Sequence, residues 1–324
     1  MRAALSVTPG SPETLEIQEI AEPVAAPGEV VIAVEAAALN FMDTLIIRDR
    51  YQVKSARPFS PAAECAGRIV AMGTDVSGFR IGDRVCAYVG HGAARERIAV
   101  ESTSVIPVPA QVRSDQAAAS IVTYGTVLYA FRDRASLAAG ETLVVTGATG
   151  GVGSAAIEVG KLLGARIVAC AGGNGKLAGL RAQGVEDFVD PDGADVKHAI
   201  RRLTGGAGAD VVLDVTGGAL TEELVRATAW DGRYLVVGFA AGAIPKLPLN
   251  LVMLKSVDVK GIHWSAWARR DPAGHRRNTE WLLAQIADGR LAPRIDAHFP
   301  LERIADALAL IEGRKVRGKV VLTF

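Results

Sequence analysis

The sequence predicts an α/β protein of two units, a β-rich module and a doubly wound parallel sheet of six strands. Residues 1–115 contain short candidate strands separated by turns rich in Pro and Gly, which is typical of an all-β module. From residue 142 onward, apolar strand segments alternate with helical ones, as in a parallel sheet covered by helices on both faces. A glycine-rich run, Gly147–Gly153, separates the first of these strands from its helix.

The length and composition are those of a compact protein with about two domains. Of the 324 residues, 49% are hydrophobic and 22% are charged. The net charge of +1 gives no field that would attract nucleic acid or an anionic membrane, so neither is an expected partner. The three cysteines are widely spaced, which indicates a reducing compartment, and no stretch resembles a signal peptide or a membrane span. We therefore expect a cytoplasmic protein.

In the β-rich module, each expected strand is bounded by turn signals such as Ala26-Pro27-Gly28 and Ile81-Gly82-Asp83. The expected strands are Ala3–Val7, Glu29–Ala37, Gly67–Met72, Arg84–Tyr88 and Arg97–Val100. A helical stretch, Ser114–Ala135, follows them and leads into the second unit.

In the second unit we expect six parallel strands, each but the last followed by a helix or a long crossover. These strands are 142–146, 166–170, 187–189, 210–214, 233–237 and 257–260. The tail adds helices Thr279–Asp288 and Leu301–Glu312 and a strand, Lys319–Leu322. We expect the tail to pack on the β-rich module, which gives one domain of residues 1–120 and 265–324 and another of 121–264.

The run Gly147–Gly153 predicts a dinucleotide site. It follows the β-branched strand Thr142–Thr146 and precedes an amphipathic helix. Its glycines permit a sharp turn and a close approach to a pyrophosphate, which would meet free N–H groups at the helix N-terminus. The residues expected to contact the cofactor here are Thr149, Gly150, Gly151 and Val152.

The segment Ala171–Lys176 bears on which nucleotide is bound. Enzymes that use NAD commonly carry an acid about 20 residues after the glycine run, where it binds the ribose 2′-hydroxyl. This segment has no acid, which leaves room for a 2′-phosphate beside Gly172 and Gly173, and Lys176 supplies a positive charge. We therefore expect NADPH. The alternative is that Lys176 is merely an exposed residue opening a helix.

Several further blocks resemble a known family, the zinc-independent quinone oxidoreductases (zeta-crystallin-like) of the medium-chain dehydrogenase/reductase superfamily. The blocks are 38–43, 124–131, 147–153, 231–240 and 318–322, in the family's order and spacing. The resemblance implies a GroES-like β-rich catalytic domain, a Rossmann domain and NADPH as cofactor. It also implies a homodimer paired through the edge segment Ala243–Leu249, whose prolines suit an isolated edge strand.

The resemblance also bears on metal binding. Zinc-dependent relatives carry a catalytic Cys where this chain has Asn40 and a His where it has Ala63, and commonly a four-cysteine cluster besides. The three cysteines and five histidines of this chain form none of the usual ligand spacings, so no metal is expected. Without a Lewis acid, the expected hydride acceptor is a quinone or an activated alkene, which delocalises the resulting charge onto oxygen.

Three residues are expected to be catalytic because they match the family's substrate-cleft positions. Asn40 is expected to hydrogen-bond the nicotinamide ribose or the acceptor oxygen, and Asp43 to hold the loop by accepting backbone N–H bonds. Tyr51 is expected beside the nicotinamide or the substrate carbonyl. The alternatives are a local cap or turn former for Asn40 and Asp43, and a surface residue for Tyr51.

Further cofactor contacts are implied by the same resemblance. Thr126 is expected beside the nicotinamide, at the start of the helix leading into the nucleotide domain, or else as a helical Thr bonding its own backbone. Lys319 matches a family lysine in the terminal strand. The remaining expected contacts follow the fourth and fifth strands, at Gly217, Gly238, Phe239, Ala240 and Ala241.

Two positions depart from the family pattern, and their roles stay open. The usual Pro-Gly-x-Glu becomes Pro61–Glu64 with Ala62 in place of glycine, which removes easy access to positive φ and predicts a different turn around Glu64. Asp190 stands where relatives carry a tyrosine near the adenosine phosphate, and an acid there disfavours a 2′-phosphate.

The predicted function is hydride transfer from NADPH to a quinone or an α,β-unsaturated carbonyl, without zinc, in a cleft between the two domains. One alternative is a reductase of enoyl- or acrylyl-CoA, whose phosphates would meet Arg48, Arg50, Lys54 and Arg57. Another is a cofactor-binding protein with a mainly non-catalytic role. The acceptor depends on a pocket built from several loops, which the sequence does not define.

Overall fold

The computed structural model of the protein describes residues 1–52, 54–172, 174–192 and 195–324, with only the backbone for 174–176. The chain divides into two compact units. The first comprises Met1–Gly125 and Ser265–Phe324, and the second comprises Thr126–Trp264. Within the described part of the chain, no helix is long and apolar enough to cross a membrane.

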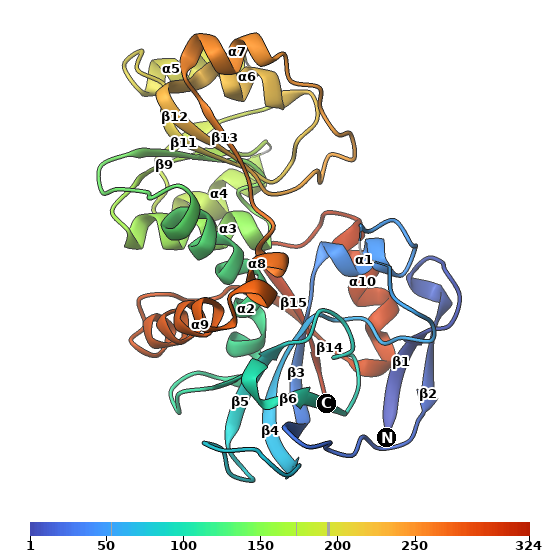
Figure 1. The fold of residues 1–324 in the computed structure, drawn as a ribbon. Helices are drawn as coiled ribbons and strands as arrows, with labels where there is room; N and C mark the ends of the chain where they lie inside the picture. The colour runs from blue at the N-terminus through green and yellow to red at the C-terminus, as the bar shows by residue number, and fades with distance from the viewer. Residues whose placement is uncertain (53, 173, 193–194) are drawn as a thin grey trace. The chain divides into compact units, whose positions relative to one another are not determined.

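The first unit is built on a largely antiparallel sheet (Figure 1). Its strands run in the order β14 (Ile295–Pro300), β15 (Lys319–Thr323), β3 (Glu29–Leu39), β4 (Glu64–Met72), β5 (Arg84–Tyr88) and β7 (Val105–Pro107), with β6 (Arg97–Glu101) paired to β3. A separate ribbon joins β1 (Arg2–Ser6) to β2 (Leu15–Glu19). Its helices include α1 (Phe41–Ile46), most of α2 (Ser114–Leu128), α9 (Pro272–Ala287) and α10 (Ile304–Glu312), with short 3-10 turns at Pro12–Thr14, Ser102–Ser104 and Leu301–Arg303.

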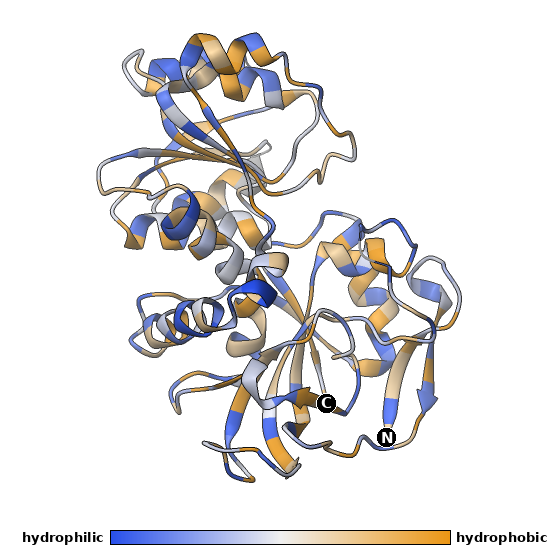
Figure 2. Ribbon diagram, in the orientation of Figure 1, coloured by the Kyte–Doolittle hydropathy of each residue, from blue (hydrophilic) through white to orange (hydrophobic). Residues whose placement is uncertain are grey.

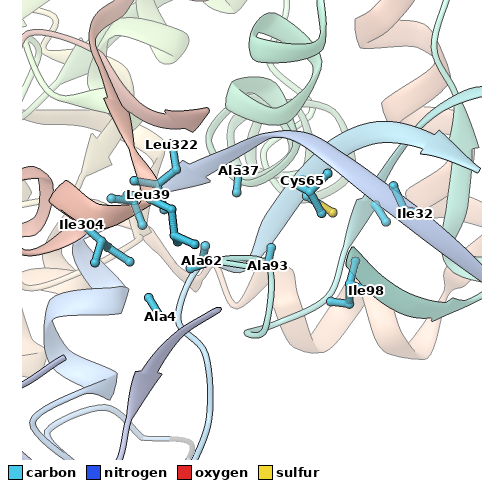
Figure 3. Packing of buried hydrophobic residues seen from close by; sticks show 14 of the residues in the cluster. Ala4, Ile32, Ala37, Leu39, Ala62, Cys65, Ala93, Ile98, Ile304 and Leu322 are labelled. Carbon is cyan, nitrogen blue, oxygen red and sulfur yellow. The ribbon is translucent and has the colours of Figure 1, made fainter. Parts of the chain in front are cut away.

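Strand β3 is the centre of the first unit because it pairs with β4, β6 and β15. Its apolar side chains enter a core that also receives residues of β4, α10 and the strand at the C-terminus. Figure 3 shows this packing: Leu39 of β3 lies near Ala62, Ile304 and Leu322, and Ile32 lies farther along the same strand, near Cys65 and Ile98. The tail is thus part of the same hydrophobic core as the N-terminal strands, which explains why this unit is discontinuous in sequence.

The second unit is a six-stranded parallel sheet and confirms the predicted Rossmann fold. Its order is β10 (Asp187–Val189), β9 (Arg166–Cys170), β8 (Thr142–Val145), β11 (Ala209–Asp214), β12 (Thr228–Val236) and β13 (Asp258–Gly261). The connections are α3 (Gly151–Leu162), α4 (Asn174–Ala182), α5 (Val196–Leu203), α6 (Leu220–Ala227) and α7 (Leu249–Lys255). Figure 1 shows α3 and α4 on one face of the sheet and α5, α6 and α7 on the other. The chain order reverses between β8 and β11, where such sheets bind ligands.

Several boundaries differ from those predicted. The short strands β2, β7 and β14 are absent from the prediction because each has only a brief alternation of apolar and polar residues. Strand β12 begins at Thr228 instead of 233, since it continues through an irregular register and a positive φ of 59° at Asp231. Helix α9 begins at Pro272 instead of Thr279, because Asp271 caps it by accepting a bond from the Gly274 N–H.

The predicted helix Ser114–Ala135 is divided. The α-helical part, α2, ends at Leu128, and a π-helical turn covers Tyr129–Arg134. A short helix, α8 (Trp264–Arg270), follows strand β13 and was not predicted from the sequence.

Candidate active site

The glycine run forms a tight loop between β8 and α3 that only glycine permits. Gly147 has a φ of 58°. A Cβ at Gly153 would lie 2.1 Å from the Gly147 carbonyl oxygen and 2.7 Å from the Ala148 Cα. Helix α3 therefore approaches the loop more closely than any side chain at 153 allows.

Helix α3 begins without a side-chain cap. Gly150 is its N-cap and has no side chain to accept a bond from the first turn. Residues Thr149 to Val152 are half-buried, so backbone N–H groups and the positive end of the helix dipole are accessible to an anion. These features fit the pyrophosphate of a dinucleotide.

The loops after β11 and β12 lie against each other. The Ala240 N–H donates to the Val215 carbonyl at 3.2 Å, and the Ala241 N–H donates to the Thr216 carbonyl at 2.9 Å. A Cβ at Gly217 would lie 2.8 Å from the Phe239 ring. The structure thus brings the predicted residues at 217 and 238–241 together, at the carboxyl ends of neighbouring strands.

A buried carboxylate that sequence reasoning missed, Asp214, joins these loops to the glycine run. Its Oδ1 accepts from the Thr146 hydroxyl at 2.8 Å, the Thr216 hydroxyl and N–H at 3.0 Å, and the Gly217 N–H at 3.0 Å. Its Oδ2 accepts from the hydroxyl groups of Tyr234 and Thr221. The signal in the sequence is an acid at the end of an otherwise apolar strand, directly before Val-Thr-Gly-Gly.

Hydroxyl groups complete this network. Thr146 connects the end of β8 to the loop after β11, because its hydroxyl oxygen accepts from the Val215 N–H at 2.9 Å. Burial, together with the Asp214 carboxylate, raises the pKa of Tyr234, so its phenol stays protonated and donates.

Two carboxylates lie beside the segment expected to hold the adenosine ribose. A Cβ at Gly172 would lie 2.9 Å from an oxygen of Asp190 and 2.9 Å from an oxygen of Asp192. The Asp192 N–H donates to Asp190 at 3.0 Å, which fixes this turn after β10. Gly173 and the side chain of Lys176 lie outside the described part of the structure.

In the first unit, Asn40, Glu64 and Lys319 form a buried polar network. The Lys319 ammonium donates to Asn40 Oδ1 at 2.5 Å and to Glu64 Oε1 at 2.8 Å, and the Asn40 Nδ2 donates to Glu64 Oε1 at 2.8 Å. Glu64 is fully buried, and Lys319 and Asn40 are 4% and 9% exposed. Lys319, whose predicted contact with the cofactor stays a prediction, donates to two side chains of its own unit.

Asp43 holds the loop around Asn40. One carboxylate oxygen accepts from the Asn40 N–H at 2.7 Å, and the other accepts from the Ala62 N–H at 3.0 Å. Asp43 is fully buried, and this burial raises its pKa to about 6. Its geometry is that of a loop-holding residue.

The turn at Ala62 corrects one expectation. The loss of the family glycine predicted a different turn, but Ala62 adopts a φ of 66°. Ala62 holds this left-handed conformation because the Asp43 bond and its buried surroundings fix it there.

Tyr51 and Thr126 occupy less polar surroundings. Tyr51 is half-buried against the core of the first unit, and burial raises its pKa, so its hydroxyl is a donor at neutral pH. Thr126 is 8% exposed. It lies near the end of α2, not at the start of a helix as predicted, because the helix begins twelve residues earlier at Ser114.

The donor set around Asn40 does not fit a zinc ion. A catalytic zinc needs about three N, S or O ligands, but Ala63 offers no donor atom, Asn40 Oδ1 and Glu64 Oε1 already accept from the Lys319 ammonium, and Glu64 Oε2 accepts from the Val122 N–H. A cation at this place would be repelled by that ammonium. Among the described residues, no group of three or more His, Cys, Asp or Glu side chains is arranged to hold a metal ion.

The basic residues near Tyr51 are partly engaged within their own unit. Arg48 pairs with Glu312 at 3.0 Å, and Arg57 pairs with Asp49 at 2.7 Å. Lys54 donates to the Asp49 carbonyl oxygen. These contacts compete with any role in binding the phosphates of a CoA ester.

The fold and these sites place the chain among known oxidoreductases. Residues 26–110 match the family model of the alcohol dehydrogenase GroES-like domain, and residues 151–276 match that of the zinc-binding dehydrogenase. The chain is 35% identical over 323 residues to quinone oxidoreductase-like protein 2 of Bos taurus. The match covers 99% of this chain and 92% of the relative. It belongs to the zeta-crystallin-like quinone oxidoreductase family of the medium-chain dehydrogenase/reductase superfamily, whose members are oxidoreductases with a Rossmann domain for a nicotinamide cofactor.

Solved structures agree with this assignment. A quinone oxidoreductase of Pseudomonas syringae pv. Tomato is 27% identical, with a TM-score of 0.92 over 100% of this chain and 99% of that one. An NAD-dependent alcohol dehydrogenase is 30% identical, with a TM-score of 0.91 over the full length of both chains.

Proposed function

We propose that the protein is a zinc-independent, NADPH-dependent reductase that transfers hydride to a quinone or an α,β-unsaturated carbonyl. The observation that carries the proposal is the network of Asn40, Glu64 and Lys319. Where zinc relatives place metal ligands, this chain offers an amide held by a buried ammonium and carboxylate. Such a site binds through hydrogen bonds, and acceptors that delocalise their own charge need no Lewis acid.

The residues have separate tasks in this proposal. When bound, the reduced nicotinamide supplies a hydride, and the acceptor takes that hydride and one proton from solvent. The Asn40 amide and the Tyr51 hydroxyl donate hydrogen bonds to the acceptor oxygen or the nicotinamide ribose. The N-terminus of α3 holds the pyrophosphate, and backbone groups at 238–241 orient the carboxamide.

We propose NADPH as the preferred nucleotide because the segment Ala171–Lys176 carries no acid. Asp190 and Asp192 lie beside Gly172 and reduce this preference, since carboxylates repel a 2′-phosphate and accept bonds from a 2′-hydroxyl. The resemblance to an NAD-dependent alcohol dehydrogenase agrees with some use of NADH.

The reduction of enoyl-CoA esters is a weaker candidate. It depends on basic residues near Tyr51, and two of these, Arg48 and Arg57, are already paired with acids. A non-catalytic role has no specific structural support in the described part of either unit.

We also propose a homodimer in a cytoplasmic, reducing location. Ile244 and Leu249 in the predicted pairing segment are 75% and 78% exposed, and Met253 of α7 is 71% exposed. A second copy would cover this apolar surface, and β13 is an edge strand of the same unit (Figure 2 shows the apolar residues of α7). The three cysteines, Cys65, Cys86 and Cys170, are free and buried.

The test is a substrate panel with both nicotinamides, containing quinones, enones and enoyl-CoA esters. We expect turnover with quinones or enones, faster at low concentrations of NADPH than of NADH, and unchanged after dialysis against a chelator. Turnover with enoyl-CoA alone would favour the second candidate, and one tightly held equivalent of zinc would overturn the metal-free site.

A further inference from the structure

The network of Asn40, Glu64 and Lys319 follows from the pairing of three strands that are far apart in sequence. Leu39 of β3 pairs with Val320 of β15, so the residues next to them, Asn40 and Lys319, meet at the edge of that pairing. Ala38 of β3 pairs with Glu64 at the start of β4. The sheet therefore delivers an amide, a carboxylate and an ammonium to one buried place.

The chemistry of the three groups permits only one orientation of the Asn40 amide. A carboxylate accepts hydrogen bonds and an ammonium only donates them. The amide oxygen faces the Lys319 ammonium at 2.5 Å, and the amide nitrogen faces the Glu64 carboxylate at 2.8 Å. A flipped amide would set two donors against each other and two acceptors against each other, in a region with little access to water.

Glu64 is itself held in place. Its Oε1 accepts from both Asn40 and Lys319, and its Oε2 accepts from the Val122 N–H of α2 at 2.6 Å. The carboxylate thus links the central strands to a helix and cannot rotate without losing three bonds. Of the three side chains, Asn40 is the most exposed, at 9%, against 4% for Lys319 and 0% for Glu64.

We propose that Glu64 and Lys319 are positioning residues that fix the Asn40 carboxamide, leaving one amide N–H of Asn40 to donate to the reactant. This inference rests on the proposed reductase function of the same site. A donor held before the reaction begins costs little reorganisation when negative charge develops on the acceptor oxygen. The buried ion pair then serves the orientation of one neutral side chain.

The kinetic test uses Glu64→Gln, which keeps the size of the side chain but removes its charge. We expect kcat to fall about 10-fold or more, with little change in the KM for NADPH, because misplacing a donor affects the transition state more than cofactor binding. In an Asn40→Ala background, Glu64→Gln should lower kcat no further. If the two losses multiply, or if Glu64→Gln leaves kcat unchanged, the proposal is wrong.

A control variant separates positioning from stability. Val321→Ala removes buried methyl groups from β15, in the strand that carries Lys319, without touching the network. It should lower the Tm while kcat stays near the wild-type value. If Glu64→Gln does not fold, the same kinetics are measured on the double variant Glu64→Gln with Lys319→Met. Removing both charges leaves no buried charge without its partner.

A spectroscopic readout does not depend on turnover. The side-chain amide of Asn40, identified by the signals lost in Asn40→Ala, should give two well-separated proton resonances with slow solvent exchange in the wild type. These should move and exchange faster in Glu64→Gln. If the Asn40 amide is immobile but the wild-type protein shows no turnover, the reductase function is refuted. If the wild type turns over but its Asn40 amide exchanges freely, the positioning role alone is refuted.

Discussion

Ala62 shows how one residue can be strained and still retained. Its left-handed φ of 66° is a conformation that favours glycine, and the Asp43 carboxylate holds its N–H at 3.0 Å. Sequence reasoning identified the missing glycine correctly but expected the turn to change. The left-handed conformation of Ala62 is held by contacts such as the bond to Asp43, which a local sequence pattern does not show.

We predict that Ala62→Gly stabilises the protein by about 1 kcal/mol, because glycine adopts this φ without a Cβ clash and the gain exceeds its loss of chain entropy. Urea denaturation measures the change. The matched control is Ala66→Gly, inside strand β4, which should destabilise. A loss of stability in Ala62→Gly would show that its conformation is unstrained.

Asp43 makes stability depend on pH. Burial raises its pKa to about 6, above the value of 3.8 for a free side chain, so the folded state holds one more proton than the unfolded state between these two pH values. This site therefore lowers the free energy of unfolding as pH rises from about 4 to about 6, by at most about 1.4 kcal/mol per pH unit, and adds no slope above that range.

Asp43→Asn isolates this effect, because the variant cannot titrate there. We predict that the stability of the wild type minus that of Asp43→Asn falls as pH rises through this window, as measured by urea unfolding at several pH values. The facing charges of Lys319 and Glu64 are the same in both proteins. A difference that stays flat or rises would mean that Asp43 is not protonated in this range.

Lys319 marks the limit of sequence reasoning at this scale. Its family position suggested a cofactor contact, while its partner Asn40 lies 279 residues away in the chain. No local pattern shows such a pairing, because it depends on which strands lie side by side in the sheet. The buried ion pair with Glu64 is visible only in the fold.

At the scale of elements, Asp214 links the ends of β8, β11 and β12. We predict that Asp214→Asn destabilises the second unit by about 2–4 kcal/mol, because an amide cannot accept from all of these donors and leaves some of them unsatisfied. It should also weaken nicotinamide binding, as measured by calorimetry, because the glycine run and the Gly217 loop lose their common anchor.

The control is Asp210→Asn. Asp210 accepts from the Thr142 N–H at 2.8 Å, where β8 begins, at the opposite end of the strand from the glycine run. The Asp210→Asn variant should lower the free energy of unfolding without changing the affinity for the cofactor. Equal losses of affinity in both variants would show a general effect of unfolding instead of a local one.

The turn after β10 should influence nucleotide choice. We predict that Asp190→Asn combined with Asp192→Asn lowers the KM for NADPH relative to NADH by about 3- to 10-fold, because two charges that repel a 2′-phosphate are removed. Asp187→Asn, which breaks the pair with Arg166 at the start of β10, is the matched control and should leave the ratio unchanged. An unaltered ratio in the double variant would place the 2′-position elsewhere.

Periodicity predicted all six parallel strands of the second unit but not all of their bounds. The apolar runs of β8 and β11 are clear because both faces are covered by helices. The start of β12 was missed because Asp231 and Gly232 read as a turn, whereas the structure accommodates them with a positive φ inside the strand. Tertiary pairing overrode the local signal there.

At the scale of the whole molecule, the exposed apolar surface near α7 argues for self-association. We predict that the wild type sediments at twice its chain mass of 33.9 kDa. The double variant Ile244→Lys with Met253→Lys should be monomeric, because it places two charges in the proposed dimer interface. Ile81→Lys, at an exposed apolar residue of the first unit, should keep the wild-type mass. A monomeric wild type would refute the dimer.

The central claim is direct hydride transfer to an acceptor without a metal. It is tested most directly by giving chelator-treated protein an enone and NADPH deuterated on the transferred position. We predict a saturated ketone that carries one deuterium at its β-carbon, since the hydride moves from the nicotinamide to carbon while the proton comes from solvent. A product without deuterium, or no product until zinc is restored, would contradict the account.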